Sequence, residues 1–81
     1  ADVNEASQEA YGTLVEAVAA CGVADPGTVA FAVWSALHGL TDIATTGIEP
    51  PRTDTPGRAE LAASVIAMCV EYVERRAASA R

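Results

Sequence analysis

Lysine is absent from this chain of 81 residues, and all five basic residues are arginines that lie within residues 52–81. The formal net charge is −6. No basic stripe exists that could neutralise a run of phosphates, so we do not expect this chain alone to bind DNA or RNA. The acidic balance also disfavours binding to an anionic membrane surface.

The chain also lacks a long hydrophobic run and a pattern of cysteines. No apolar stretch is long enough to span a bilayer, and no signal-peptide pattern is present. The two cysteines, Cys21 and Cys69, are isolated, and each falls on the apolar side of an expected helix. We therefore expect buried thiols in a cytoplasmic protein, with a single Cys21–Cys69 disulfide as the alternative.

Residue patterns that carry catalysis are missing as well. The sequence has one histidine, no Gly-rich phosphate loop, no paired carboxylates and no metal-ligand spacing of cysteine and histidine. Ser35 lies one turn from His38, but nothing else completes a catalytic triad. We expect no enzymatic activity, no metal and no cofactor.

Apolar residues, in contrast, are abundant for a chain of this size. They make up 51% of the sequence, whereas a small domain has much surface per volume and is normally more polar. The only methionine is Met68, and the chain begins with Ala1. We expect either an oligomer or a processed, trimmed or excised piece of a larger protein.

Hydrophobic periodicity and helix-capping residues predict three helices and no strands. The first spans residues 4–21, with Asp2 and Glu5 as a capping box and Gly22 as its stop. Its apolar side comprises Ala6, Ala10, Tyr11, Leu14, Ala17, Val18 and Cys21.

The second helix spans residues 26–46, with Asp25 as its cap, Pro26 as its first residue and Gly47 as its stop. It has hardly any purely solvent-facing side. One face carries Val29, Val33, Ala36, Leu37, Leu40, Ile43 and Ala44, and the other carries Phe31, Trp34, Ser35, His38, Thr41, Asp42 and Thr45. A face that mixes aromatics, a histidine and hydroxyl groups is typical of a subunit interface or a ligand pocket.

Residues 48–55 are expected to form a loop, after which Thr55 caps a third helix that begins at Pro56 and ends near Arg76. Apolar residues cover more than half of its circumference, so it needs more than one neighbour, and a second copy of the chain is one candidate. Glu71 and Arg75 are spaced for an exposed ion pair. The tail, residues 77–81, is expected to fray.

Gly39 and His38 stand out in the second helix. Glycine is costly inside a helix, so Gly39 predicts a close approach of another helix, with Ser35 and Ala36 completing a patch of small residues. His38 is expected to be a structural residue in a subunit interface, bonded to Asp42, Ser35 or a group of the partner chain. The alternative is a histidine that contacts a ligand or senses pH.

The stretch Trp34-Ser35-Ala36-Leu37-His38-Gly39 resembles the Trp-x-x-x-His-Gly signature of the WHG-type C-terminal domain of TetR-family transcriptional regulators. The order of the expected helices agrees with that domain over nearly the whole chain. The resemblance implies a regulatory domain whose last two helices form a four-helix bundle across a homodimer. It also implies an unknown small-molecule effector, and DNA binding only through a missing N-terminal helix-turn-helix domain, as in a repressor.

On this basis residues 1–81 form one C-terminal regulatory and dimerisation domain. The expected dimer interface comprises Phe31, Ser35, His38, Gly39, Asp42, Leu61, Val65, Met68, Cys69 and Tyr72. The expected ligand contacts are Tyr11, Leu14, Val33, Trp34 and Leu37. Two other readings stay open: a stand-alone acidic helical interaction protein without a ligand, and an acidic carrier protein, although the latter lacks an Asp-Ser attachment site.

Overall fold

The computed structural model describes residues 3–46 and 57–81, and in these ranges the chain is all-α. Three helices follow one another: α1 (Val3–Ala20), α2 (Pro26–Thr46) and α3 (Arg58–Ser79). The expectation of three helices without strands is confirmed for this part of the chain. None of these helices combines the length and the apolar character that a membrane-spanning helix needs.

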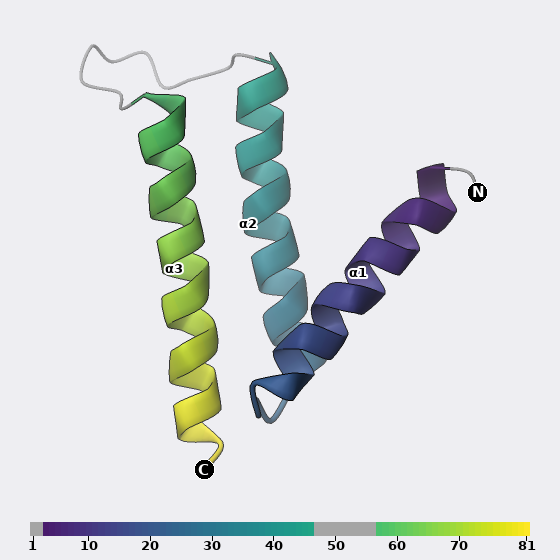
Figure 1. Ribbon diagram of the computed structural model, residues 1–81, viewed down its shortest axis with the longest axis vertical. Helices are drawn as coiled ribbons and strands as arrows, with labels where there is room; N and C mark the ends of the chain where they lie inside the picture. The colour runs from purple at the N-terminus through teal and green to yellow at the C-terminus, as the bar shows by residue number, and fades with distance from the viewer. Residues whose placement is uncertain (1–2, 47–56) are drawn as a thin grey trace.

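The helices α2 and α3 lie side by side and antiparallel, forming one layer (Figure 1). α1 crosses one face of this layer near the start of α2 and then diverges from it, so that Val3–Ala10 are all exposed. All three helices pack together only at the end where they converge, whereas α2 and α3 stay neighbours along their length. The opposite face of the α2–α3 layer is left without a covering helix in the described part of the chain.

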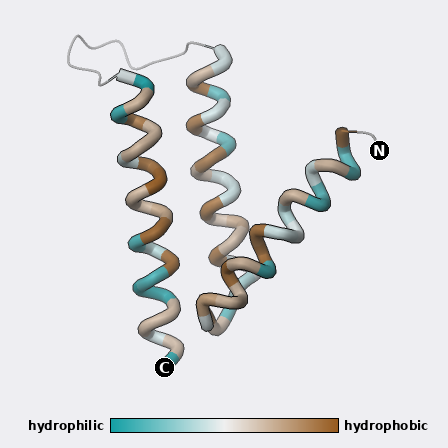
Figure 2. The backbone as a smooth tube through the Cα atoms, in the orientation of Figure 1, coloured by the Kyte–Doolittle hydropathy of each residue, from teal (hydrophilic) through white to brown (hydrophobic). Residues whose placement is uncertain are grey.

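The chain is correspondingly open. Its radius of gyration is 14.7 Å, whereas a compact domain of this length would have about 12 Å. Its accessible surface is 5754 Å², against roughly 4,600 Å² for a compact monomer of the same mass. Hydrophobic residues also lie along most of the length of α2 and α3, well beyond the converging end (Figure 2). The single chain therefore leaves a large apolar surface in water.

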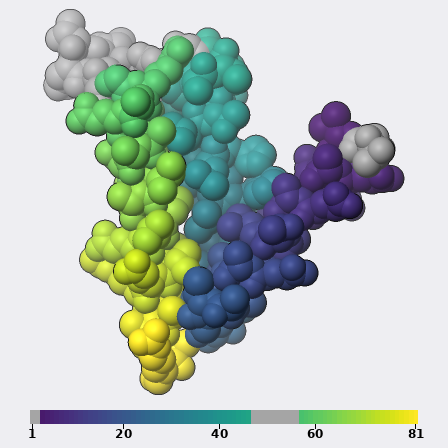
Figure 3. All heavy atoms as spheres, viewed as in Figure 1, coloured from purple at the N-terminus to yellow at the C-terminus, as the bar shows by residue number. Residues whose placement is uncertain are grey.

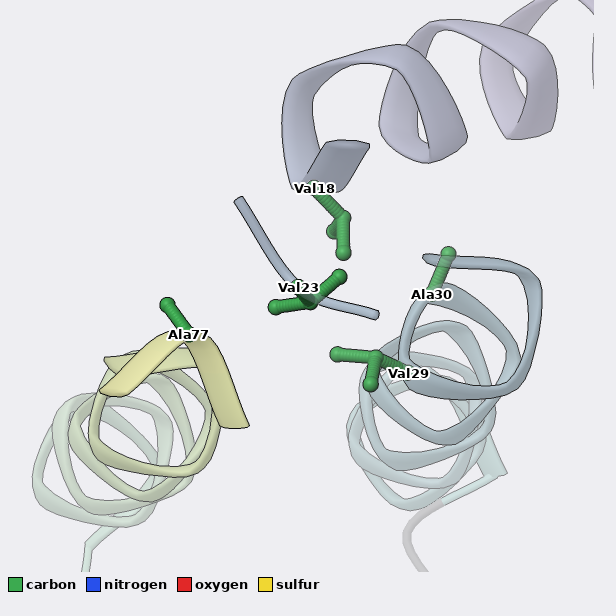
Figure 4. Packing of buried hydrophobic residues seen from close by; sticks show 5 residues of the cluster. All are labelled: Val18, Val23, Val29, Ala30 and Ala77. Carbon is green, nitrogen blue, oxygen red and sulfur yellow. The ribbon is translucent and has the colours of Figure 1, made fainter. Parts of the chain in front are cut away.

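The core is small and is built from short side chains. Five buried residues from all three helices and the α1–α2 turn form one cluster, namely Val18, Val23, Val29, Ala30 and Ala77 (Figure 4). Half-buried side chains pack around it, among them Tyr72 and Val73 of α3. Val29 is the largest side chain that is fully buried. The converging end of the three helices is therefore the part of the fold most sensitive to loss of volume.

The expected boundaries of α1 and α2 agree with the structure to within one residue. Gly22 has a φ of +87°, and this left-handed conformation ends α1, as predicted. The backbone N–H of Thr28 donates to Asp25 Oδ1 at 3.3 Å, and the Thr28 hydroxyl donates to Asp25 Oδ2 at 2.5 Å. The predicted cap is thus confirmed, whereas Asp2, Gly47 and the 48–55 loop lie outside the described residues.

The expected boundaries of α3 were wrong at both ends. The N-cap is Gly57, whose backbone is extended (φ −64°, ψ 160°), so α3 begins at Arg58 and not at the expected position 56. At the other end the helix continues to Ser79, and Ala77 is only 5% exposed. Residues 77–79, which were expected to fray, belong to the helix because α3 closes the core at its C-terminal end. The Glu71–Arg75 ion pair is formed, as predicted, at 2.5 Å.

The Asp25 cap makes α2 sensitive to acid. The hydroxyl and backbone hydrogen bonds from Thr28, aided by the charge of Arg76, hold the pKa of Asp25 below its usual 3.8. A pKa that is lower in the native than in the unfolded state stabilises the fold at pH values above the unfolded pKa, and this contribution is lost as the pH falls through the native pKa.

Asp25→Ala should lower the melting temperature at pH 7, and the difference from the unsubstituted protein should shrink below about pH 4. Circular dichroism melts at several pH values measure this. Glu16→Ala, on the exposed side of α1, is the control, and a deficit that is constant with pH would contradict the cap.

Candidate functional site

Aromatic side chains gather where α1 crosses α2. The Tyr11 ring is edge-on to Trp34, with centroids 5.2 Å apart, and edge-on to Phe31, with centroids 6.3 Å apart. The imidazole of His38 packs against the Trp34 ring, with ring centroids 4.6 Å apart. The Tyr11 hydroxyl donates to the Gly27 carbonyl at 3.4 Å, which ties the cluster to the start of α2.

This cluster joins residues that the sequence assigned to different sites. Phe31 and His38 were expected in the dimer interface, and Tyr11 and Trp34 were expected to contact a ligand. Phe31, Trp34 and His38 share one side of α2 because they are three and four positions apart. Tyr11 of α1 packs against the first two of them. Sequence periodicity did reveal the stripe on α2, but it gave no indication of which helix would lie beside it.

The hydrogen bond of His38 also differs from the expectation. Its Nδ1–H donates to the Trp34 carbonyl at 3.0 Å rather than pairing with Asp42 or Ser35. The Ser35 hydroxyl likewise donates to the carbonyl one turn earlier, at Phe31. Both groups are exposed and satisfied by their own helix. Within the single chain, His38 therefore needs no partner from another element.

Two cavities flank α1. The first, which we call the aromatic hollow, has a volume of about 270 Å³ and is lined by Ser7, Gln8, Tyr11, Phe31 and Trp34. The second, the α1–α3 cleft, has a volume of about 330 Å³ and is almost entirely apolar; it is lined by Leu14, Ala17, Val18, Cys21, Val33, Cys69, Val70, Val73 and Glu74. The expected ligand contacts are thus divided: Tyr11 and Trp34 line the hollow, and Leu14 and Val33 line the cleft. Leu37 is half-buried and lines neither of them.

The two cysteines line the same cleft, Cys21 from the turn after α1 and Cys69 from α3, and their sequence positions did not predict this. Both are free, so the disulfide alternative is not realised. Cys21 is exposed rather than buried, because it follows the last residue of α1 in the turn that leaves the core. Its thiol donates to the Ala17 carbonyl at 3.4 Å.

The other residues that were expected in the dimer interface lie mainly on the side of the α2–α3 layer that α1 does not cover. On α3, Met68 is on the opposite side from Val70, which lines the cleft, and on α2, Gly39 lies about 140° around the helix from Trp34. We call this side the open face; by helical position it comprises Ser35, Ala36 and Gly39 of α2 with Leu61, Val65, Met68 and Tyr72 of α3. Met68 is 67% exposed.

Gly39 makes no close crossing within its own chain. A Cβ added there would meet no atom within 4 Å. The small residues of the open face leave α2 smooth on that side, so a second helix can approach its backbone. A close contact at Gly39 with a second chain stays a prediction.

No cluster of three or more acidic, cysteine or histidine side chains that could hold a metal ion occurs in residues 3–46 and 57–81. Comparison of this chain with known protein families, with characterised proteins and with solved structures found no match.

Proposed function

We propose that this chain is the dimerisation and effector-binding part of a TetR-like transcriptional regulator, a repressor released from DNA by a small molecule. The observation that carries the proposal is the open face of the α2–α3 layer. It combines small residues on one helix with exposed or half-exposed apolar side chains on the other. The Trp-x-x-x-His-Gly pattern lies in the middle of the same helix, α2.

The architecture supports a second copy of the chain as the missing layer. Domains normally bury an apolar layer against another layer, and two antiparallel helix pairs related by a twofold axis make a four-helix bundle. The surface in excess of a compact monomer is on the order of 1,100 Å². A standard interface buries about 800 Å² on each partner. The excess, which is spread over the whole chain, is comparable in size to one side of such an interface.

An effector is supported by the two cavities beside α1. The α1–α3 cleft, at about 330 Å³, is within the usual size range of ligand pockets and is lined by apolar side chains. It is bounded by α3, a helix of the proposed bundle, so a ligand that parts α1 from α3 would act directly on the dimer. In this proposal a parent protein, rather than this chain, binds DNA; the proposal agrees with the lack of lysine and arginine in residues 3–46 and the restriction of the described arginines to residues 58–81.

Sedimentation equilibrium of the chain tests the dimer, and a well-folded monomer at micromolar concentration would refute the proposal. Gly39→Leu sharpens the test. Because the site is empty within one chain, the leucine should leave the monomer folded but overpack the bundle, weakening the dimer by about 1–3 kcal/mol.

Gly12→Leu is the matched control for this substitution. A Cβ at Gly12 also meets nothing within 4 Å, and Gly12 lies in α1, outside the proposed bundle. The two variants share the gain in helix propensity, so a difference between their dimer dissociation constants isolates the contact. Equal dimer dissociation constants for the two variants would rule out a close helix crossing at Gly39.

A further inference from the structure

The α1–α3 cleft is lined by residues of all three helices and of the turn after α1. Two of its lining residues belong to the buried part of the fold: Val18 of α1 is 4% exposed and Val33 of α2 is 7% exposed. Val70 of α3, which is 51% exposed, lines it as well. The cleft therefore connects the apolar core with the surface.

The cleft offers almost no hydrogen-bonding group to a ligand. Except for Cys21, its lining residues lie within helices, whose backbone groups bond to one another. The carbonyls in the last turn of a helix lack such partners, and Cys21 supplies them here. Its backbone N–H donates to the Val18 carbonyl at 3.0 Å, and its thiol donates to the Ala17 carbonyl at 3.4 Å. A polar group of a ligand would lose its bonds to water in this cleft without replacement, which is costly.

The charge around the cleft disfavours an anion. Glu74, which is exposed, is its only acidic lining residue, and no lysine or arginine lines it. Arg75, the next residue of α3, is paired with Glu71. Arg81 lines a neighbouring hollow near the end of α3, and that hollow shares Glu74 with the cleft. A ligand with an acid group would therefore find no cation among the lining residues and would be repelled by Glu74.

We propose that the α1–α3 cleft binds an uncharged, apolar small molecule that carries no acid group. Burial of its apolar surface against the valines and Leu14 drives the binding. Val70 and Met68 lie on opposite sides of α3, since they are two positions apart, so a second copy on the open face leaves the cleft accessible. The proposal names the class of the effector, and its regulatory consequence rests on the proposed function.

Two dyes that differ only by one charged group test the ligand class. N-Phenyl-1-naphthylamine is uncharged and becomes fluorescent in apolar surroundings, and 8-anilino-1-naphthalenesulfonate is the same ring system with an added sulfonate. The full chain is titrated with each dye. The uncharged dye should bind saturably, with one molecule per chain, and the sulfonate should bind at least tenfold more weakly. The affinity for the uncharged dye should not fall at high salt, because no charge is paired.

The cysteines show where the dye binds. Cys21 and Cys69 are the only two in the chain, and both line the cleft. Alkylation by N-ethylmaleimide, followed by mass spectrometry of peptides, measures each thiol separately. The uncharged dye should slow the alkylation of Cys69, which is half-buried. Saturable binding that protects neither thiol would place the dye on another apolar surface and overturn the proposal.

Two pairs of variants separate the cleft from the rest of the surface. Ala17 and Ala19 are both exposed on α1, but only Ala17 lines the cleft. Ala17→Phe should fill the cleft and weaken dye binding at least tenfold, whereas Ala19→Phe should not change it. Val70 and Ile66 are 51% and 52% exposed on α3, and only Val70 lines the cleft. Val70→Glu should weaken binding at least tenfold, and Ile66→Glu should leave it unchanged. Because all four sites are exposed, the substitutions do not disturb the core.

Three further results would overturn the proposal: no saturable binding of the uncharged dye, equal affinity for the sulfonate, or full binding in Ala17→Phe. A Cys69 thiol that is protected in the dimer without dye, and becomes reactive in the monomer, would show that a second copy covers the cleft instead. Sedimentation of the same samples separates these outcomes from failure of the proposed function. A dimer that does not bind the dye refutes the ligand site alone, whereas a monomer that binds it in the cleft refutes the bundle and leaves the site standing.

Discussion

Met68→Glu should raise the dissociation constant of the homodimer by two to three orders of magnitude while leaving the isolated chain folded. Met68 is 67% exposed in the single chain, so the monomer can accept a charge there. In the proposed bundle the same position is buried against the partner. An uncompensated buried charge costs about 3–5 kcal/mol, and each 1.4 kcal/mol is roughly tenfold in affinity.

Ala67→Glu provides the control, because it adds the same charge at the adjacent position of α3. Ala67 lies by helical position on the polar stripe with Glu60, Ser64 and Glu71, away from the open face. Sedimentation equilibrium should therefore show an almost unchanged dimer for Ala67→Glu and a monomer for Met68→Glu. Equal effects of the two substitutions would place the interface elsewhere on the chain.

The second large effect concerns the core. Val29→Ala should reduce the free energy of unfolding by about 2–3 kcal/mol, from lost apolar burial and the cavity that remains. Val29 is 0% exposed and sits where all three helices converge. Few other side chains could compensate, because the rest of the cluster consists of valines and alanines.

Urea denaturation followed by circular dichroism measures this loss. Val3→Ala removes the same atoms from a side chain that is 84% exposed and should change the stability by less than about 0.5 kcal/mol. Both proteins must be compared at one concentration, because dimerisation stabilises the folded state by mass action. Equal stabilities for the two variants would show that the converging end is not the centre of the fold.

Helix positions were predictable because their signals are local. Asp25 with Pro26 gave the start of α2, and Gly22 gave the end of α1, since a cap depends only on neighbouring backbone groups. The predicted start of α3 was wrong because the extended residue that precedes the helix is Gly57, which the sequence pattern of a cap at Thr55 and a first residue at Pro56 did not indicate. Its end was wrong because the burial of Ala77 comes from α1 and α2, which are distant in sequence.

Only part of the candidate sites could be predicted from the sequence. The stripe that includes Phe31 and His38 could be read from periodicity, and so could the apolar sides that carry Cys21 and Cys69. The sequence did not show which of these residues come together in space. Phe31 joins Tyr11 in the aromatic hollow, and the two cysteines line one cleft, because α1 crosses the α2–α3 layer at an angle that no sequence pattern encodes (Figure 3).

The sequence by itself determined the helical class, the excess of apolar surface and the concentration of positive charge in the C-terminal part of the chain. These are properties of composition and of local periodicity, which act on each helix separately. Only the tertiary structure decided which face of α2 meets α1, which face stays open and where the few buried valines gather. These depend on crossing angles, and a crossing angle is set by the packing of side chains from several helices at once.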